Sequence, residues 1–295
     1  ALDLALEYEF EGKSAWYKLQ LNISNKLIFS KWREALGGRL IGIVTGAAAL
    51  QPKLAKAFSA AQISCREGYG LTETSPVVSF NRFEEGGCIF GTVGYPIENV
   101  EVKLAEDGEI LVKGPNVMRG YFNKPEETAD VIDSEGWFHT GDLGKFVNGK
   151  FLKIIDRKKE LYKTSGGKYV APQPLENKFK ESPLIEQIMV VGNDKNFVSA
   201  LIVPSMDSLN AFCEENGIEY DTIEELLEHA NVMAGYEAVL AEVRLPFSNT
   251  EQIKKFKLLP NEWTIDGGEL TPTMKVKRKN ILEKYAKEID EIYNG

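Results

Sequence analysis

The first long pattern in the chain is a stripe of large apolar side chains at helical spacing, formed by Trp16, Leu19, Ile23 and Leu27. Polar and charged residues fill most positions between them. This pattern predicts a helix over residues 14–36, which the following pair of glycines ends.

A strand, a turn of small residues and a second helix are predicted next. Residues 39–44 form a short apolar run, and Pro52 opens a helix that continues to Ala61. A strand–turn–helix order is typical of an α/β layer. Small residues at the carboxyl end of a strand leave room for a ligand, although they equally permit close helix packing. The candidates for such a pocket are Gly46, Ala47 and Ala48.

Between residues 91 and 113 the pattern changes from helical spacing to an alternation of apolar and polar positions. Strands are predicted within this segment, including residues 109–112 after an Ala-Glu-Asp-Gly turn, and again at 149–155 after an Asn-Gly turn. A short helix is expected at 125–131 within the intervening loops. Together these elements predict a small antiparallel sheet or barrel.

A domain boundary is predicted at 156/157, where a strand ends in a run of charges. The two expected domains are therefore 1–156, which is α/β, and 157–295, which is a smaller α+β domain. Within the second domain we expect a helix at 174–180, strands at 185–192 and 198–203, a helix-rich segment at 207–258, a candidate strand at 262–265 and a last amphipathic helix at 277–292.

Composition narrows the class of protein. The 295 residues are 43% hydrophobic and carry a net charge of −9, which argues against a general nucleic-acid binder but allows a small anionic ligand. Three widely spaced cysteines indicate reduced thiols in a cytoplasmic protein, and two distant histidines argue against a histidine-based metal site. The longest mostly apolar run has about 11 residues, whereas a membrane span needs about 20, so no transmembrane segment is predicted.

The segment GYGLTET at 68–74 places three kinds of ligand-binding group on one glycine-containing loop. The phenol of Tyr69 can stack on a purine, the hydroxyl of Thr72 can bind a phosphate, and the carboxylate of Glu73 can reach a magnesium ion. The alternative interpretation is an ordinary buried aromatic residue followed by a helix-capping pair.

Three further segments carry candidate chemistry. In GWFHTGD, Asp142 offers two acceptor oxygens to ribose hydroxyls, or closes a simple turn. In IDRKKELYKTSGG, Arg157 can donate to ribose or phosphate, and Gly166 and Gly167 let backbone approach a ligand; a solvated charge run and an ordinary turn are the alternatives. In LTPTMKVKRKN, a loop lysine can neutralise charge that develops during acyl transfer, although the charges alone favour a surface basic patch.

These segments, in this order, resemble the adenylate-forming (AMP-binding) superfamily and, within it, the long-chain fatty acyl-CoA synthetases. The resemblance extends from GGRLIGIVTGAAAL at 37–50 to LTPTMKVKRKN at 270–280 and includes GEILVKGPNVMRGYFNKPEET at 108–128. It implies a large adenylation domain followed by a smaller, mobile carboxyl-terminal domain.

The resemblance also implies a role for each candidate residue. Tyr69 would stack on adenine, Thr72 would contact the α-phosphate, and Glu73 would bind magnesium. Asp142 and Arg157 would hold the ribose, and Gly46, Ala47 and Ala48 would lie beside the adenine and acyl pocket. Lys159 would be the hinge between the domains, Gly166 and Gly167 would face the pantetheine of CoA, and Lys275 would promote adenylation.

The implied reaction uses ATP, Mg²⁺, a fatty acid and CoA. The fatty carboxylate attacks ATP to give an acyl-adenylate and pyrophosphate, and the CoA thiol then displaces AMP, with rotation of the small domain between the two steps. An adenylating enzyme that loads an acyl carrier protein, and a non-catalytic ligand-binding remnant, remain alternatives. Peripheral contact of the basic segment 275–279 with a membrane is a further alternative.

The sequence departs from the family's pattern in two ways. No Thr/Ser/Gly-rich phosphate loop precedes GYGLTET, and the family is about twice as long, so we expect a carboxyl-terminal portion that is inactive alone. The family's usual Gly-Gly-Ala-Pro sequence after the first strand is Gly-Ala-Ala-Ala here, so that Ala47 occupies the position of the second glycine. Its methyl group is expected to narrow the adenine side of the pocket.

Overall fold

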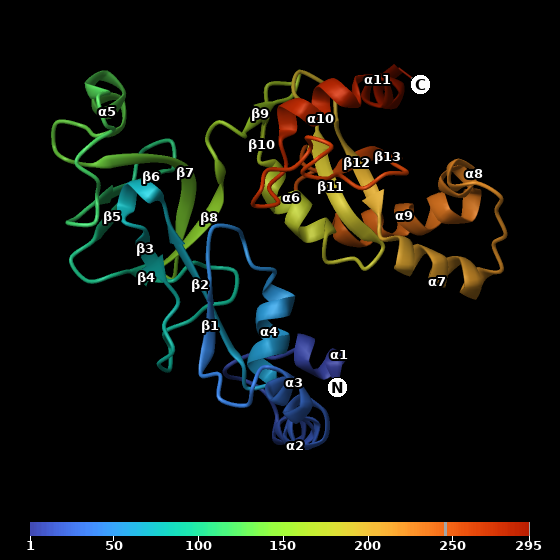
Figure 1. Cartoon of the computed structure of the whole chain (residues 1–295), viewed down its shortest axis with the longest axis horizontal. Coiled ribbons are helices and arrows are strands. Elements are labelled where there is room, and N and C mark those ends of the chain that lie inside the picture. The colour runs from blue at the N-terminus through green and yellow to red at the C-terminus, as the bar shows by residue number, and fades with distance from the viewer. Residues whose placement is uncertain (245–246, 295) are drawn as a thin grey trace. The chain divides into compact units, whose positions relative to one another are not determined.

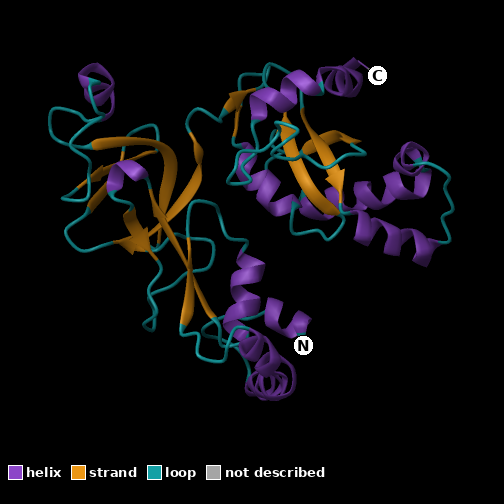
Figure 2. Cartoon of the chain, viewed as in Figure 1, coloured by secondary structure: helices purple, strands orange, loops and turns teal. Residues whose placement is uncertain are grey.

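The computed structural model describes residues 1–244 and 247–294 and divides into two compact units, Ala1–Lys158 and Lys159–Gly295 (Figures 1 and 2). The sequence-based boundary lies two residues before this division. We describe each unit by itself.

The amino-terminal part of unit 1 is helical. The predicted helix over 14–36 is divided by a π-helical turn, and Ser14 caps its start by accepting the Tyr17 N–H at 3.2 Å. The helical segments are α1 (Leu2–Leu6), α2 (Ala15–Ser24), the π turn (Asn25–Phe29), α3 (Ser30–Ala35) and α4 (Pro52–Ala60).

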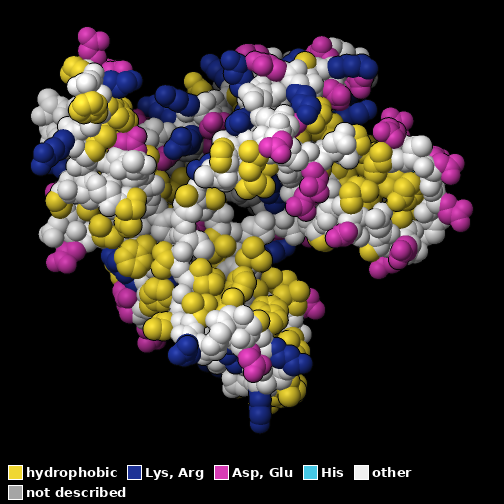
Figure 3. Space-filling model, viewed as in Figure 1, with side chains coloured by type: hydrophobic (Ala, Val, Ile, Leu, Met, Phe, Trp, Pro, Cys, Tyr) yellow, Lys and Arg dark blue, Asp and Glu magenta, His cyan; other side chains and the backbone are white. Residues whose placement is uncertain are grey.

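The apolar stripe of the predicted helix does not face a core, contrary to what its spacing suggests. The stripe residues are exposed, including Trp16 at 67% and Leu27 at 63%. Figure 3 shows apolar side chains gathered on the part of unit 1 that carries α1 and α4. A different face packs on α4, where Phe29 is fully buried in an apolar cluster with Ala57 and Ala60. Polar contacts add to it, because Asn25 donates to the Ala60 carbonyl at 2.8 Å and Arg33 donates to Asn25 at 2.8 Å.

The first sheet of unit 1 combines a parallel and an antiparallel part. Its order is β1-β2-β3-β4, with β1 parallel to β2 and the later pairs antiparallel. The strands are β1 (Gly42–Thr45), β2 (Ser64–Gly70), β3 (Val77–Phe80) and β4 (Tyr95–Pro96). The loop with Gly46 therefore leaves β1 at the same edge where Tyr69 lies near the end of β2.

The second sheet of unit 1 is antiparallel, as predicted, with the order β5-β6-β7-β8, although no strand was predicted at the position of β7. Its strands are β5 (Glu101–Leu104), β6 (Glu109–Lys113), β7 (Phe138–Val147) and β8 (Phe151–Arg157), and α5 (Pro125–Val131) lies between β6 and β7. Asp142, expected on a loop, instead lies within β7. A buried apolar cluster that includes Val78, Ile110 and Leu152 joins the two sheets.

Unit 2 is built on a mixed sheet, β11-β12-β13, in which β11 and β12 are antiparallel and β12 and β13 are parallel. The strands are β11 (Ile185–Val191), β12 (Val198–Pro204) and β13 (Ile253–Leu258), and a small hairpin consists of β9 (Tyr162–Lys163) and β10 (Tyr169–Val170). The helices are α6 (Pro172–Phe179), α7 (Met206–Asn216), α8 (Ile223–Glu228), α9 (Ala230–Val243), α10 (Arg278–Lys284) and α11 (Ala286–Asn294).

Apolar clusters cover both faces of this sheet. Ala200 and Ile202 of β12 belong to the cluster formed with α6, α7 and α9, whereas Leu201 and Val203 belong to the cluster formed with α10 and α11. Figure 1 draws these two helix groups on opposite sides of the sheet. Because side chains alternate along a strand, the continuous apolar run of β12 serves both cores.

Segment 207–258 of unit 2 is rich in helices, as predicted, but it also contains the strand β13, which was not predicted. The predicted final helix over 277–292 is interrupted at Tyr285. Residues 262–265 form no strand; instead, the side chain of Gln187 exchanges two hydrogen bonds with the Trp263 backbone, at 2.7 and 3.0 Å. Within residues 1–244 and 247–294, no helix has the length and apolar character that crossing a bilayer requires.

Candidate functional site

The GYGLTET segment begins as the end of β2 and continues into a 3₁₀ turn at Thr72–Thr74. Gly70 is required by close approach of the chain, because a Cβ atom at this position would lie 1.7 Å from the Pro76 carbonyl oxygen. This approach folds the segment back on itself. Tyr69 is thereby placed within the last residues of β2, and Thr72 and Glu73 lie just beyond its end.

Tyr69 near the end of β2, Asp142 within β7 and Arg157 at the end of β8 lie together. The Tyr69 hydroxyl donates to Asp142 Oδ2 at 2.6 Å, and Arg157 Nε lies 3.2 Å from Asp142 Oδ1. Asp142 and Arg157 are also register partners in β7 and β8. Burial raises the pKa of Tyr69, and the neighbouring Asp142 carboxylate raises it further, so the phenol stays protonated and remains the donor.

The buried Asp142 is oriented by its own chain. Gly141 has φ +70°, a left-handed value that glycine adopts without strain, and the Asp142 N–H donates to Thr140 Oγ1 at 3.1 Å. Thr140 in turn donates to the Ile110 carbonyl at 2.8 Å. The strand is therefore bent at Asp142, which explains how a strand residue can present its carboxylate as a loop residue would.

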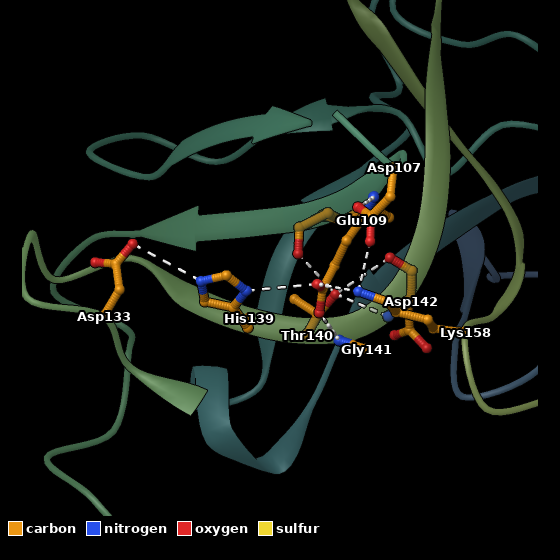
Figure 4. A network of polar contacts seen from close by, with 9 residues as sticks. Asp107, Glu109, Asp133, His139, Thr140, Gly141, Asp142 and Lys158 are labelled. Carbon is orange, nitrogen blue, oxygen red and sulfur yellow. Dashed lines mark hydrogen bonds and ion pairs between the residues drawn. The ribbon is translucent and has the colours of Figure 1, made fainter. Parts of the chain in front are cut away.

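A polar network holds this bend against β6 (Figure 4). The nearly buried Glu109 accepts the Gly141 N–H at 2.9 Å and the Lys158 ammonium at 3.1 Å, and His139 Nδ1 lies 3.4 Å away. Lys158 also pairs with Asp107 at 2.5 Å. Burial opposes ionisation of Glu109, but Lys158, Gly141 and His139 outweigh it and hold the pKa of the carboxyl below its usual value.

Glu73 is paired with a residue to which the sequence assigned no role. The Tyr121 hydroxyl donates to Glu73 Oε1 at 2.9 Å, and the Met118 N–H donates to the Glu73 carbonyl at 2.8 Å. The alternative interpretation of Thr72 and Glu73 as a helix-capping pair does not hold, because Thr74 bonds to both backbone groups of Leu71. Among the described residues, the exposed Thr72 hydroxyl has no hydrogen-bond partner.

The small-residue loop after β1 lies beside the end of β2. A Cβ atom on Gly46 would lie 3.5 Å from the Gly68 carbonyl oxygen, and residues 46–48 are exposed. Ala47 has φ +65°, the left-handed conformation that its methyl group disfavours. The residue at the second position of the family's Gly-Gly pair thus adopts a backbone conformation suited to glycine.

The remaining candidates belong to unit 2. Gly166 and Gly167 form the exposed tip of the β9–β10 hairpin, where Gly167 has φ +79° and donates to the Thr164 carbonyl at 2.8 Å. Lys159 is exposed at the first position of unit 2. Lys275 is exposed on the loop between β13 and α10, and no carboxylate in the described part of the chain pairs with its ammonium.

Two protein-family models match this chain and show the family to which it belongs. The model of the AMP-binding enzyme matches residues 13–122, and the model of the AMP-binding enzyme C-terminal domain matches residues 160–295. The chain belongs to the AMP-binding enzymes.

Curated relatives of the chain include long-chain-fatty-acid–CoA ligases. The long-chain-fatty-acid–CoA ligase FadD15 of Mycobacterium bovis is 40% identical over 273 residues, which cover 92% of this chain and 45% of the relative. Human long-chain-fatty-acid–CoA ligase 1 is 37% identical, with 92% and 40% covered. The chain therefore spans less than half the length of these relatives.

Solved structures support the mixed α/β fold class. The adenylation domain of the carboxylate reductase from Mycobacterium chelonae matches 99% of this chain and 44% of its own, with a TM-score of 0.72 and 23% identity. The A domain of carboxylic acid reductase from Segniliparus rugosus, solved with AMP and a co-purified carboxylic acid, covers 96% and 43%, with a TM-score of 0.70 and 24% identity. The resemblance to AMP-binding enzymes is thus confirmed, together with the fold.

Sequence reasoning missed the residues that orient the candidates. Tyr121 and Glu109 both lie in the quoted segment GEILVKGPNVMRGYFNKPEET, which was the only signal available for them. Their partners are 48 and 32 residues away along the chain, so spacing alone could not reveal the contacts.

Proposed function

We propose that this chain carries nucleotide-binding and lysine-bearing parts of a long-chain fatty acid–CoA ligase. In the first half-reaction, a carboxylate oxygen of the fatty acid attacks the α-phosphorus of ATP, and pyrophosphate leaves. In the second, the CoA sulfur attacks the acyl carbon, AMP leaves, and the thiol proton is released. The observation that carries the proposal is the Tyr69–Asp142–Arg157 cluster in a chain of this family.

Asp142 has the capacity to hold a ribose. Each of its carboxylate oxygens has one protein partner, Tyr69 or Arg157, and a carboxylate oxygen can accept two hydrogen bonds. One acceptor position therefore remains on each oxygen for the two ribose hydroxyls. The hydrogen bond to Asp142 also restrains the Tyr69 ring, whose proposed role is to stack on adenine. Gly46, Ala47 and Ala48 would line the same nucleotide site.

Glu73 fits a magnesium site that is completed by substrate. Mg²⁺ prefers oxygen ligands and is commonly held by one or two carboxylates together with substrate phosphates. Tyr121 occupies Glu73 Oε1, which leaves Oε2 for a metal, and no cluster of three or more metal-ligating side chains occurs among the described residues. When bound, Mg²⁺ would neutralise charge on the ATP phosphates, and the neighbouring Thr72 hydroxyl would contact the α-phosphate.

The residues of unit 2 are proposed to act in turn. Lys275 would place its ammonium against the charge that develops between the fatty carboxylate and the α-phosphate, which is stabilisation by a preorganised cation. Gly166 and Gly167 would let the hairpin tip approach the pantetheine of CoA in the second step. Lys159 would be the position at which the chain turns between the two steps.

Calorimetric titration of AMP into the 295-residue chain tests the nucleotide site. We expect Asp142→Ala to weaken binding at least tenfold, because hydrogen bonds to a charged group contribute about 1.5–3 kcal/mol each. The matched control is Asp130→Ala, since Asp130 is exposed on α5 and outside the cluster. Absence of AMP binding, or equal affinities for the two variants, would contradict the proposed site.

The reaction is tested with the intact gene product. It is supplied with ATP, Mg²⁺ and palmitic acid, and thioester formation is followed with CoA in one arm and a phosphopantetheinylated carrier protein in the other. We expect turnover with CoA. If thioester forms only on the carrier protein, CoA is not the acceptor and that part of the proposal is wrong. Adenylation without transfer to CoA or to the carrier protein would contradict the ligase assignment.

A further inference from the structure

The loop that carries Lys275 is a tight turn with few anchors of its own. The Met274 N–H donates to the Thr271 carbonyl at 2.8 Å, and the Thr271 N–H donates to the Lys275 carbonyl at 2.8 Å. Lys275 also donates its N–H to Thr271 Oγ1 at 3.0 Å. The Lys275 ammonium has no ion-pair partner in the described residues, so the position of Lys275 depends on what holds the two ends of the turn.

The end after Lys275 is held by Arg278, the first residue of α10. Its Nη2 donates to both carboxylate oxygens of Glu176 on α6 at 2.7 Å, and its Nε lies 2.8 Å from Glu160. Glu176 is buried and also accepts the Val190 N–H of β11 at 2.8 Å. One guanidinium therefore connects the lysine loop with α6, β11 and the residue that follows Lys159.

The end before Lys275 is held from the same helix. Glu269, which is buried, accepts the Thr264 N–H at 3.2 Å and pairs with Lys284 at the last position of α10. The Glu269 carbonyl accepts the Lys277 N–H at 2.7 Å, which closes the base of the turn. Both ends of the lysine loop thus depend on ion pairs made by α10.

Stability alone is a weak reason for a buried Arg–Glu pair. Removing two charges from water costs several kcal/mol, and replacing such a pair with apolar residues is often neutral or stabilising. A guanidinium also has fixed donor directions, so it specifies geometry as well as charge. The Arg278 guanidinium contacts two carboxylates from separate segments of unit 2. This arrangement is suited to fixing the direction in which the chain leaves the Lys275 loop.

We propose that Arg278 is a positioning residue that fixes the Lys275 loop on α6 and β11 and ties it to Glu160, so that the lysine turns with the chain at Lys159 as one rigid piece. This inference rests on the proposed adenylation role of Lys275. Arg278 acts only through the loop and is not assigned any contact with substrate.

The test replaces the ion pair without leaving a buried charge. Arg278→Met alone would strand Glu176, so the informative variant is Arg278→Met with Glu176→Leu. Hydrogen exchange of the 295-residue chain is expected to quicken at least tenfold at the amides of Met274 and Lys275, while β12 stays protected. The matched control is Lys279→Met, because the Lys279 side chain is 87% exposed and, within the described part of the chain, its ammonium pairs only with Glu283, at 4.0 Å.

Adenylation kinetics of the intact gene product supply the second readout. We expect kcat for ATP–pyrophosphate exchange to fall at least tenfold in the double variant while the KM for ATP changes less than twofold. Arg278→Lys, which cannot reach both carboxylates, is expected to restore only part of the rate, and Glu160→Gln to lower it about threefold.

The outcomes separate this inference from the proposed function. Unchanged loop exchange in a folded double variant would overturn the positioning role, as would faster exchange with wild-type kcat and KM. A wild-type protein without adenylation activity would instead overturn the proposed function before any variant is made.

Discussion

Strand β12 of unit 2 is buried along its whole length and contributes to two cores, whereas the most regular apolar stripe of unit 1 faces outward. Both patterns are strongly hydrophobic in the sequence. The stripe of unit 1 is a good predictor of a helix, but it does not mark the face by which that helix packs. In unit 2 the run of consecutive apolar residues predicts both the strand and its burial, because no side chain of β12 can avoid a core.

Buried acidic side chains are held in two ways. Glu67 of β2 in unit 1 is buried and accepts the Leu50 N–H at 2.9 Å, and it has no ion-pair partner among residues 1–244 and 247–294, whereas the buried Glu109 of the same unit pairs with Lys158. In unit 2, Glu269 is buried against Lys284. Burial without a cation favours the protonated form of a carboxyl group, whereas a paired cation favours the ionised form, which predicts opposite contributions to stability as pH changes.

The largest expected effect contrasts two tryptophans. Trp263 is 1% exposed in the unit 2 core, and Trp16 is 67% exposed on α2. We expect Trp263→Ala to lower the free energy of unfolding of unit 2 by about 3–5 kcal/mol, because it removes a large buried ring and leaves a cavity. Trp16→Ala is the matched control and should change stability by less than about 0.5 kcal/mol.

Denaturant unfolding followed by far-UV circular dichroism measures both variants, and hydrogen exchange assigns each transition to a unit. An equal loss of stability from Trp16→Ala would show that the outward stripe is packed in solution, for example between copies of the chain. The apolar stripe of unit 1 would then be buried, as the apolar run of β12 is in unit 2.

The second prediction concerns pH and is smaller. Burial raises the pKa of Glu67 to about 7, from about 4.5, although the Leu50 N–H opposes this. Because the folded state holds this proton more tightly, the Glu67 contribution to the stability of unit 1 is expected to be lost as pH rises from about 4.5 through about 7, by at most about 3.4 kcal/mol at 1.36 kcal/mol per pKa unit. The check is the free energy of unfolding at pH 5 and pH 8 for the wild type and Glu67→Gln, which should abolish most of the difference.

Glu269 supplies the opposite case. Burial alone would raise its pKa, but Lys284 and backbone N–H groups lower the pKa of Glu269 below its ordinary value. Its contribution to unit 2 is therefore present above the unfolded-state pKa and is lost as pH falls below it. If the difference between wild type and Glu67→Gln has the same sign as the contribution of Glu269, the raised pKa of Glu67 is contradicted.

The sequence predicted elements well where the signal is local. Helix α5 begins at Pro125, and the apolar runs that predicted β11 and β12 mark buried strands. It failed where distant partners decide the structure. β13 has lysines at several positions and is a strand because it pairs with β12, about 50 residues earlier. Residues 262–265 satisfy two backbone groups with the side chain of Gln187 instead of a strand.

The candidate site divides in the same way. The motifs pointed to Tyr69, Asp142 and Arg157, and the structure brings these three into contact, while their roles remain predictions. The bend that presents Asp142 depends on Glu109, and the lysine loop depends on Arg278 and Glu176. These orienting contacts join segments separated by about 30 to 100 residues, so they appear only once the chain is folded.

The smallest expected effect tests backbone strain at the edge of the nucleotide site. Ala47 has φ +65°, whereas Ala48 does not have a positive φ. A left-handed non-glycine residue costs about 1–2 kcal/mol, and the greater entropy of unfolded glycine offsets about 0.5–1 kcal/mol of that. We therefore expect Ala47→Gly to stabilise unit 1 by about 0.5–1 kcal/mol and the adjacent Ala48→Gly to destabilise it by a similar amount. Denaturant midpoints of the two variants measure this difference in sign, and a loss of stability from both would show that the turn after β1 is not strained at Ala47.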